Sequence, residues 1–455
     1  MMDRRLALLV AGAFFMEILD GTVIAPAAPH IAADLGVSPV DVNVAVTAYV
    51  LTVAVLVPVS GWLADRAGPR RVFAAALVVF TLASVGCALA PTLPVLVGTR
   101  VLQGVGGAMM VPVGRLVVLR TTDRADLVRA IAYLTWPALL APVLAPAIGG
   151  LLAQYASWRW IFLVNVPLGA AALAAARVLV PRLPAHDPGP LDRWGFLLGA
   201  SGIAALVGGL ELLGAQAPRW SVVAVLLVAA VVLLGTAVRH LLRTRRPLVD
   251  LRVLTVHTLR VTASAGSLFR AVISAVPFLL PLLFQLGFGW SAAQAGLVVI
   301  ALFVGNVGIK PATTPLMRRF GARTVMLAAL AASIAMLAAI AFLRADTPLW
   351  LVLAVLVASG IGRSVGFTTY NSIAFADVEP ARMTPANTLV STLQEISAGL
   401  GVAVGALLVR LGDTITPAAP FRLAFLALAA LLTPAVLVAV RLPRNAAAEV
   451  TGHHP

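Results

Sequence analysis

Hydrophobic residues fall along this chain in runs of about twenty, separated by short segments rich in charge, proline or glycine. Stretches such as Ser221 to Val238 are apolar on every side, so they show neither the one-sided pattern of a surface helix nor the alternation of a half-buried strand. A helix of about 20 apolar residues is long enough to cross the hydrocarbon core of a bilayer. The pattern therefore predicts an all-α polytopic membrane protein.

Fourteen such runs predict fourteen membrane spans. They lie at residues 6–28, 43–63, 72–90, 93–118, 131–154, 161–181, 195–214, 221–241, 262–286, 292–314, 324–343, 349–371, 386–410 and 420–440. Two short basic segments, 61–71 and 314–323, resemble each other, and each joins two adjacent spans on the same side, which implies two related halves. Their separation exceeds the roughly 190 residues that six spans need, so two extra helices should lie between the halves.

The predicted domains follow from this plan. We expect an N-terminal six-helix bundle at 1–183, two inserted helices with an inner linker at 184–255, a C-terminal six-helix bundle at 256–441 and a cytoplasmic tail at 442–455. Many secondary transporters place a central cavity between two such related bundles.

Composition supports a membrane protein and locates its charge. Hydrophobic residues make up 61% of the chain and charged residues 11%, whereas soluble domains carry about 25% charged residues. Most of the 33 Lys and Arg residues fall in loops on one side of the predicted spans, so both termini should be cytoplasmic and the net charge of +15 needs no nucleic-acid partner. The single cysteine, Cys87, allows no intramolecular disulfide, and we predict neither a metal nor a cofactor.

Four motifs are similar to those of one transporter family. Leu19–Ile24 holds an acidic first-helix motif, Gly61–Arg71 an inner-loop signature, Arg100–Gly104 a fourth-helix motif and Ala145–Gly150 a fifth-helix antiporter motif. With these motifs in this order, the chain resembles the fourteen-span drug/proton antiporters of the major facilitator superfamily. The fold expected from the resemblance is two six-helix bundles with two extra central helices.

The resemblance extends over nearly the whole chain. Residues 158–169 and 281–297 resemble two further stretches that are typical of these antiporters. The sequence departs from the family's pattern at Pro69, Ala145 and Arg318, and Ala145 weakens any argument that depends on close glycine packing.

This resemblance implies a bacterial inner-membrane exporter. It would exchange protons moving inward for small amphipathic molecules or drugs moving outward, by alternating access between the two halves. The resemblance implies no enzymatic activity. The partners of the protein would be its small-molecule substrate, protons and the lipid bilayer, and the protein would be a monomer. The sequence contains no G-x-x-x-x-G-K-[ST] phosphate-binding motif, so we expect the proton gradient to drive transport.

Three alternatives stay open at this point. A dedicated exporter of a self-made metabolite, such as an antibiotic, a siderophore or an amino-acid derivative, would share the mechanism and differ in cargo. A non-transporting membrane sensor would make the embedded acidic residues dispensable. A polytopic membrane enzyme would need a polar cluster in a long loop, and the mostly short loops of this chain offer none.

Charged residues inside the predicted spans are the main functional candidates, because an ionised side chain is costly in a bilayer. Glu17 and Asp20 lie three residues apart on one face of the first helix, and Arg100 lies at a similar depth on the fourth. Two neighbouring carboxylates do not easily both ionise, so one should keep its proton. We expect one network in which Asp20 carries the coupling proton and Glu17 either modulates it or contacts substrate cations. The alternative is a purely structural pairing with Arg100.

The predicted C-terminal half holds its own embedded charges. Glu395 and Arg363 fall at a similar depth and are expected to pair, with Glu395 as a second candidate proton carrier. Arg270 and Lys310 have no obvious acidic partner. Counting Arg115 as well, the embedded bases outnumber the embedded acids, which favours an anionic or zwitterionic cargo.

Further candidates line the predicted cavity and the fifth helix. The cavity candidates are Met16, Gln103, Trp136, Arg270, Gln285 and Lys310. In the fifth helix, Pro142, Pro146, Gly149 and Gly150 should give kinks and close packing that seals the cavity against proton leak, or packing alone.

The inner loop between the second and third spans is the predicted gate. Its candidate residues are Gly61, Asp65, Arg66, Gly68 and Arg70. We expect Asp65 to pair with Arg115 or Arg120 in one conformation and to release it in the other. The alternative is a tight turn that sets topology and has no gating role.

Overall fold

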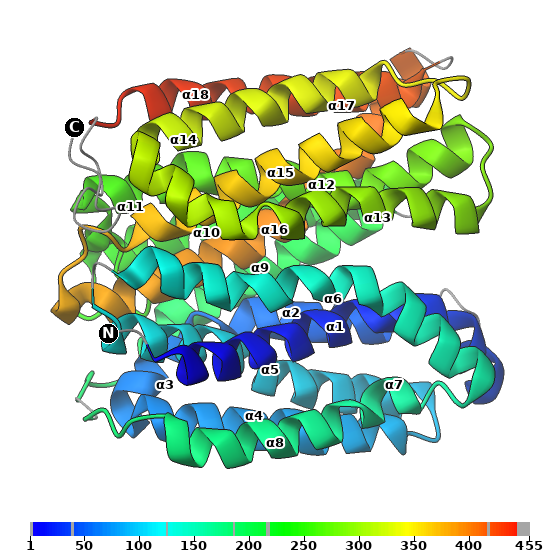
Figure 1. Ribbon diagram of the computed structural model, residues 1–455. Coiled ribbons are helices and arrows are strands. Elements are labelled where there is room, and N and C mark those ends of the chain that lie inside the picture. Colours follow the sequence, from blue (N-terminus) through cyan, green and yellow to red (C-terminus); the bar gives the residue numbers. More distant parts are fainter. Residues whose placement is uncertain are drawn as a thin grey trace.

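The computed structural model describes residues 3–37, 41–123, 126–184, 187–214, 219–415 and 419–443. These residues are mostly helical and contain no strand, which confirms the predicted all-α class (Figure 1). Both ends of the chain lie at the same end of the helix bundle, which we name the terminal end, and the opposite end is the far end (Figure 1).

The N-terminal half consists of α1 (Arg4–Leu35), α2 (Asn43–Leu56), α3 (Val59–Ala67), α4 (Pro69–Ala88), α5 (Leu93–Thr121), α6 (Leu127–Tyr155), α7 (Trp160–Leu163) and α8 (Asn165–Leu179). The carboxylate of Asp3 caps α1 by accepting hydrogen bonds from two backbone N–H groups, and Gly36 ends the helix in a left-handed conformation. The span expected at 43–63 is bent: α2 and α3 meet at a 61° angle next to Pro58, which cannot donate a helical hydrogen bond.

The C-terminal half is longer and more interrupted. It consists of α11 (His257–Val261), η3 (Thr262–Gly266), α12 (Ser267–Leu282), η4 (Leu283–Gly287), α13 (Ala292–Gly308), α14 (Lys310–Ala341), α15 (Leu349–Ala374), η5 (Pro380–Arg382), α16 (Met383–Ile415), α17 (Pro420–Leu431) and α18 (Thr433–Val440). The segments η3 and η4 are π-helical turns inside one continuous rod, a distortion that is frequent at functional sites. The expected span at 292–314 is interrupted between α13 and α14 at Ile309.

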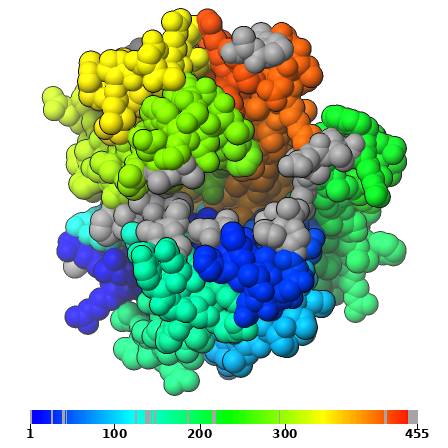
Figure 2. Space-filling model, turned by 90° about the vertical axis from the view of Figure 1, so that its right-hand side faces the viewer, coloured from blue at the N-terminus to red at the C-terminus, as the bar shows by residue number. Residues whose placement is uncertain are grey.

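Two helices join the halves, α9 (Arg193–Gly214) and α10 (Trp220–Arg243), followed by η2 (Leu251–Thr255). The two helices pack against each other, and α9 also contacts α2 of one half and α16 of the other. In α10 the buried residues Val223, Ala230 and Ala237 follow a seven-residue interval, and other apolar residues, such as Val225 and Val231, are exposed. Figure 2 shows this green pair on the flank of the far end, beside the junction of the two halves.

The two halves share an unusual turn. Gly68 follows α3 with φ 85° and ψ 134°, and Gly321 interrupts α14 with φ 76° and ψ 155°. Both glycines lie in the two similar basic segments of the sequence, and a left-handed φ favours glycine because it has no side chain. Corresponding segments of the halves therefore have the same backbone geometry.

Within the described residues, eleven helices are long and apolar enough to cross a membrane, and the bent pair α2–α3 makes a possible twelfth. The α13 helix is apolar but shorter, and α14 counts as one helix despite its kink at Gly321. The total of fourteen spans and the domain boundaries at 183, 255 and 441 stay predictions.

Close backbone packing makes the C-terminal half sensitive to added volume. A Cβ on Gly360 of α15 would lie 1.9 Å from the Leu302 carbonyl oxygen of α13, whereas a Cβ on Gly296 of α13 would meet nothing within 4 Å. Gly360→Ala should lower the free energy of unfolding by about 1–3 kcal/mol, because the backbone of α13 must shift. Thermal unfolding of the purified protein in detergent measures this, with Gly296→Ala as the control. Equal unfolding temperatures for the two variants would contradict the prediction.

Candidate functional site

A buried polar network surrounds Asp20 in the N-terminal half. Arg100 of α5 forms an ion pair with the Asp20 Oδ2 atom, and both side chains are fully buried. The Asp20 Oδ1 atom accepts hydrogen bonds from Gln103 Nε2 at 2.8 Å and from Asn165 Nδ2 at 2.7 Å. Gln103 also donates to the Ser84 hydroxyl at 2.7 Å. The carboxylate charge is thus compensated by donors from α5 and α8.

Arg100 has further support within the same half. Its Nε donates to the Ala45 carbonyl oxygen at 3.3 Å, and its guanidinium carbon lies 4.1 Å from the centre of the Tyr49 ring. A cation over an aromatic face is stabilised when water is excluded. Asp20 and Arg100 therefore form a neutral pair that is held in place on several sides.

Glu17 lies outside this network, although the sequence predicts one network of Glu17, Asp20 and Arg100. Its side chain has no ion pair or hydrogen bond among the described residues, and the Tyr49 hydroxyl donates only to its backbone oxygen, at 3.4 Å. Three residues of a helix turn through about 300°, so the side chains of Glu17 and Asp20 leave the helix about 60° apart. Asp20 is buried within the half, whereas Glu17 keeps exposed surface. Glu17 therefore faces the space between the halves.

A second group of charges gathers where the halves meet. The charge of Glu395 on α16 interacts most strongly with Arg270 on α12 and then with Arg115 on α5, and Glu17 interacts with Glu395 and Arg115. We name Glu17, Arg115, Arg270 and Glu395 the central cluster. The predicted pair of Glu395 with Arg363 is wrong, because no ion pair joins them and Arg363 instead lies near the like charge of Arg270. The sequence gives the depth of a residue along its helix, but not the direction in which its side chain points around the helix axis.

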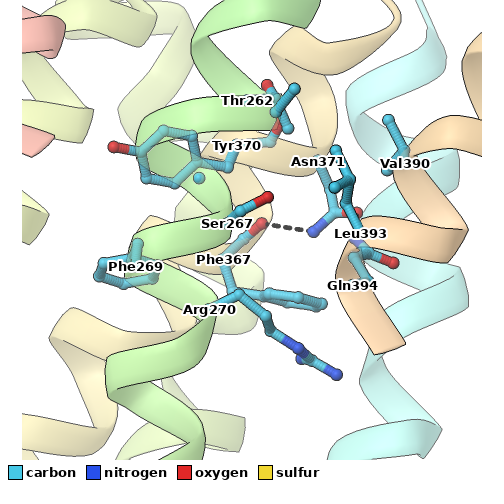
Figure 3. Close-up of a pocket in the computed structure, with 12 residues that line it drawn as sticks. Thr262, Ser267, Phe269, Arg270, Phe367, Tyr370, Asn371, Val390, Leu393 and Gln394 are labelled. Carbon is cyan, nitrogen blue, oxygen red and sulfur yellow. Dashed lines mark hydrogen bonds between the residues drawn. The ribbon is translucent and has the colours of Figure 1, made fainter. Parts of the chain in front are cut away.

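The central cluster is tied across the two halves by amides. Arg115 Nη2 of α5 donates to Gln394 Oε1 of α16 at 2.9 Å, and Gln394 Nε2 donates to Asn371 Oδ1 of α15 at 2.7 Å. Asn371 in turn donates to the Phe367 carbonyl oxygen at 2.8 Å, the dashed line in Figure 3. Of these hydrogen bonds, the one from Arg115 to Gln394 joins the two halves, so it would have to break if the halves moved apart at this level.

A small pocket in the C-terminal half borders the central cluster. It lies between η3–α12, α15 and α16, and Figure 3 shows Arg270 extending past Phe367 toward the side on which Gln394 lies. The Arg270 guanidinium carbon is 4.8 Å from the centre of the Phe367 ring. Arg270 Nε and the Tyr370 hydroxyl are buried and have no hydrogen-bond partner in the described structure. The pocket wall therefore offers donors that a ligand could use.

The terminal end holds another polar contact between the halves. Arg120 of α5 forms an ion pair with Asp65 Oδ1 at 2.9 Å, and the Thr384 hydroxyl of α16 donates to the same oxygen at 3.2 Å. Arg120 also donates to Thr384. Of the two predicted partners of Asp65, the structure thus places Arg120 beside it, and Arg115 lies in the central cluster. We name Asp65, Arg120 and Thr384 the terminal-end contact.

Helix packing supports the same contact. A Cβ added to Gly61 would lie 2.0 Å from the Thr388 hydroxyl oxygen of α16, so the glycine allows α3 to approach the other half closely. The other predicted gate residues point elsewhere: Arg66 lies 3.9 Å from the exposed Asp187, and Arg70 donates to the Arg177 carbonyl oxygen of α8. Those interactions stay within the N-terminal half and the segment after it.

The remaining predicted site residues are dispersed. Met16 is buried, Gln103 belongs to the Asp20 network, Gln285 lies in η4, and Lys310 donates to Thr368 at 2.5 Å. The fifth-helix candidates lie in α6, where Gly149 is buried; the side chains of Trp136, Pro142 and Pro146, and residue Gly150, are not described.

The predicted set left out several polar residues that the structure places at the site: Ser84, Asn165, Asn371, Thr384 and Gln394. A polar side chain inside an apolar span is itself a signal that could have found Asn371 and Gln394. The described residues contain no group of three or more His, Cys, Asp or Glu side chains that could hold a metal ion.

Comparisons with known proteins agree with this architecture. The model of the Major Facilitator Superfamily matches residues 10–255 and 262–453. Relatives named "Putative multidrug resistance protein MdtD" include that of Serratia proteamaculans, 38% identical over 407 residues, which cover 88% of this chain and 84% of the relative. The Escherichia coli O6:H1 relative of that name is 35% identical over 450 residues, which cover 96% and 94%.

Two solved structures are similar in fold. The human organic anion transporter MFSD10 (TETRAN) has a TM-score of 0.68 and 16% identity, with 96% of this chain and 99% of that chain covered. The proton:xylose symporter XylE bound to 6-bromo-6-deoxy-D-glucose has a TM-score of 0.68 and 14% identity, with 98% of each chain covered. At these identities the likeness shows the fold alone.

The Asp20 network predicts a stability effect. Asp20→Asn should lower the free energy of unfolding by about 3–5 kcal/mol, because it leaves the Arg100 charge buried without its counter-ion. Thermal unfolding in detergent, followed by circular dichroism, measures this. The matched control is Asp34→Asn, which breaks the exposed pair with Arg159 and should have little effect. The double variant Asp20→Asn/Arg100→Gln should recover part of the loss, and a double variant less stable than Asp20→Asn would contradict this explanation.

Proposed function

Because this chain belongs to the major facilitator superfamily of membrane transporters, we propose that it is a proton-coupled secondary active exporter of small amphipathic molecules or drugs. The observation that carries the proposal is the buried ion pair of Asp20 and Arg100 beside a central cluster that joins the two halves. The MdtD relatives, which are named multidrug resistance proteins and are covered over most of their length, support an export role.

The membrane orientation follows from charge. Arg66, Arg70, Arg120 and Arg318 lie in or beside the segments at the terminal end, and basic residues concentrate on the cytoplasmic side of membrane proteins. We therefore assign the terminal end to the cytoplasm and the far end to the outside of a bacterial inner membrane, with both termini cytoplasmic. The protein acts as a monomer in this proposal.

Alternating access uses the contacts between the halves. The terminal-end contact and the hydrogen bond from Arg115 to Gln394 link the halves in this conformation, which corresponds to a state closed toward the cytoplasm. Opening toward the cytoplasm breaks both. The Asp20–Arg100 pair lies within one half, so the motion of one half against the other does not itself break it.

A proton provides the means to break the buried pair. When Asp20 takes up a proton from the outside, it loses its charge, and Arg100 loses the counter-ion that holds it. Glu17, one helical turn away on α1 and exposed to the space between the halves, is placed to relay the proton or to contact cargo. Release of the proton toward the cytoplasm restores the pair. Each cycle thus exchanges inward protons for outward cargo.

The central cluster favours one alternative cargo, a self-made metabolite that is anionic or zwitterionic. Arg115 Nε and Nη1, Arg270 Nε and Arg363 Nη1 are buried and have no hydrogen-bond partner in the described structure. Such donors are costly to leave unpaired, and a carboxylate or phosphate of the cargo would satisfy them. A dedicated exporter of such a compound would use the same proton exchange.

Substrate-induced proton release tests the coupling. Purified protein in weakly buffered detergent is mixed with ethidium, norfloxacin or salicylate, which are cationic, zwitterionic and anionic, and a pH dye reports protons. A transported compound should release protons from the wild type, and the Asp20→Asn variant should lose the release because the carrier is gone.

Two variants make this result specific. Asp34→Asn, which removes a surface carboxylate with a similar arginine partner, should release protons as the wild type does. Glu395→Gln separates the two predicted carriers. Release that survives in folded Asp20→Asn but is lost in Glu395→Gln would place the coupling in the C-terminal half. A compound that the protein transports without any proton release would contradict antiport and favour another energy source.

The terminal-end contact predicts a conformational effect. Asp65→Asn removes the ion pair with Arg120, which is only partly exposed, and should shift the equilibrium toward the open cytoplasmic side by about two- to fivefold. Labelling of a cysteine at the buried Thr388 with a polar maleimide, in a Cys87→Ser background, measures this opening. The control Arg66→Gln breaks an exposed pair that does not reach the other half. Equal labelling of both variants would show a turn without a gating role.

A further inference from the structure

A large cavity lies outside the central cluster, at the seam between the two halves. It is lined by Arg129 and Tyr133 of α6 in the N-terminal half and by residues of α13 and α14 in the C-terminal half. It is open on one side, and the empty space in it and at its mouth amounts to about 1170 Å³. Figure 1 shows α6 beside the first part of α14, and α6 contacts α13, α14 and α15. Arg129 lies near the start of α6, so the cavity begins near the terminal end. We name it the seam cavity.

The chemistry of the seam cavity is basic and apolar. Among the described residues, its lining includes the three bases Arg129, Lys310 and Arg318 and no Asp or Glu. Pro311 and Pro315, four residues apart on one face of α14, line it with exposed apolar surface. A ligand that fits such a wall carries negative charge at one end and hydrocarbon at the other.

The two basic residues of α14 that line the cavity lie at different distances from the terminal end. Arg318 is exposed near the terminal end, whereas Lys310 is 4% exposed and its Nζ atom donates to the Thr368 hydroxyl. Eight residues of helix separate them by about 12 Å. The seam cavity therefore reaches from the level of the lipid headgroups into the level of the acyl chains. The acids nearest in sequence, Asp123 and Asp126, precede α6 and are not among the lining residues.

We propose that the seam cavity binds an anionic phospholipid of the cytoplasmic leaflet, with its phosphate between Arg129 and Arg318 and its apolar part along Pro311 and Pro315. Basic pockets between membrane helices on the cytoplasmic side bind the headgroups of anionic lipids. A free phosphate would contact the arginines but would leave the proline wall exposed. The inference rests on the membrane orientation proposed above and does not depend on the identity of the cargo.

A lipid in this position contacts both halves at once. When the halves move, Arg129 and Arg318 change their separation, because one belongs to each half, so the bound phosphate favours the conformation in which both reach it. The lipid is thereby a regulator of alternating access. The amount of anionic lipid in the membrane then determines how strongly the conformation closed toward the cytoplasm is stabilised.

Lipid-dependent thermal unfolding of the full chain in detergent tests the proposal. Dioleoylphosphatidylglycerol should raise the unfolding midpoint of the wild type by roughly 2 °C or more beyond the neutral dioleoylphosphatidylcholine. The Arg129→Ala/Arg318→Ala variant should lose most of this difference. The matched control is Arg319→Ala, because Arg319 is next in sequence and equally exposed but stacks on Phe320 at 5.2 Å and does not line the cavity.

Native mass spectrometry of the same samples counts bound lipid and does not depend on stability. The wild type and Arg319→Ala should retain one more phosphatidylglycerol than the double variant. Inorganic phosphate should cause no shift, and a shift as large as that of the lipid would overturn the proposal in favour of a free-anion site. Equal loss in Arg319→Ala and the double variant, or none in either, would also overturn it. These readouts need no transport, so they fail independently of the exporter proposal.

Discussion

The hydrocarbon core of the bilayer contains no water that could solvate a charge, and the arrangement of the functional residues depends on this constraint. Each embedded charge must be paired inside the protein or face a polar space. Asp20 and Arg100 take the first solution: they are fully buried and form an ion pair, and the Asp20 carboxylate accepts further hydrogen bonds from Gln103 and Asn165. Glu17 and Glu395 take the second, since they keep exposed surface where the halves meet. The Asp20–Arg100 pair is therefore fixed inside one half, whereas Glu17 and Glu395 are accessible to cargo between the halves.

One helix connects these levels. Along α5, Arg100 belongs to the buried network, Arg115 to the central cluster and Arg120 to the terminal-end contact, and the first and last of these lie about 30 Å apart along the helix axis. Arg115 and Arg120 bond to α16 of the other half, whereas Arg100 bonds within its own half. The Asp20 pair and both contacts between the halves are therefore connected through one continuous helix.

Packing within a half differs from packing between the halves, and this difference would allow the halves to move relative to each other. Inside the C-terminal half, glycines bring backbones together: Cβ atoms on Gly305 or Gly401 would lie about 2.0 Å or less from carbonyl oxygens of α15 or α12. Such packing resists deformation. Between the halves, the polar contacts are hydrogen bonds and an ion pair, which can be exchanged for bonds to water or cargo. In the proposed transport cycle, the halves would therefore move as units and cargo would enter between them.

The sequence by itself determined the all-α membrane class, because apolar runs of spanning length permit no other backbone structure in a bilayer, and its motifs identified the superfamily, which the comparisons confirm. It also indicated which charges are embedded, because burial of an ionised group is visible as a charge inside an apolar run. Only the tertiary structure decided their partners. Depth along a helix follows from residue number, but the direction of a side chain depends on helix rotation, kinks and packing. For that reason the sequence did not show that Asp20 pairs with Arg100 alone, with Glu17 outside that network. Nor did it show that Glu395 interacts with Arg270 and Arg115 and not with Arg363.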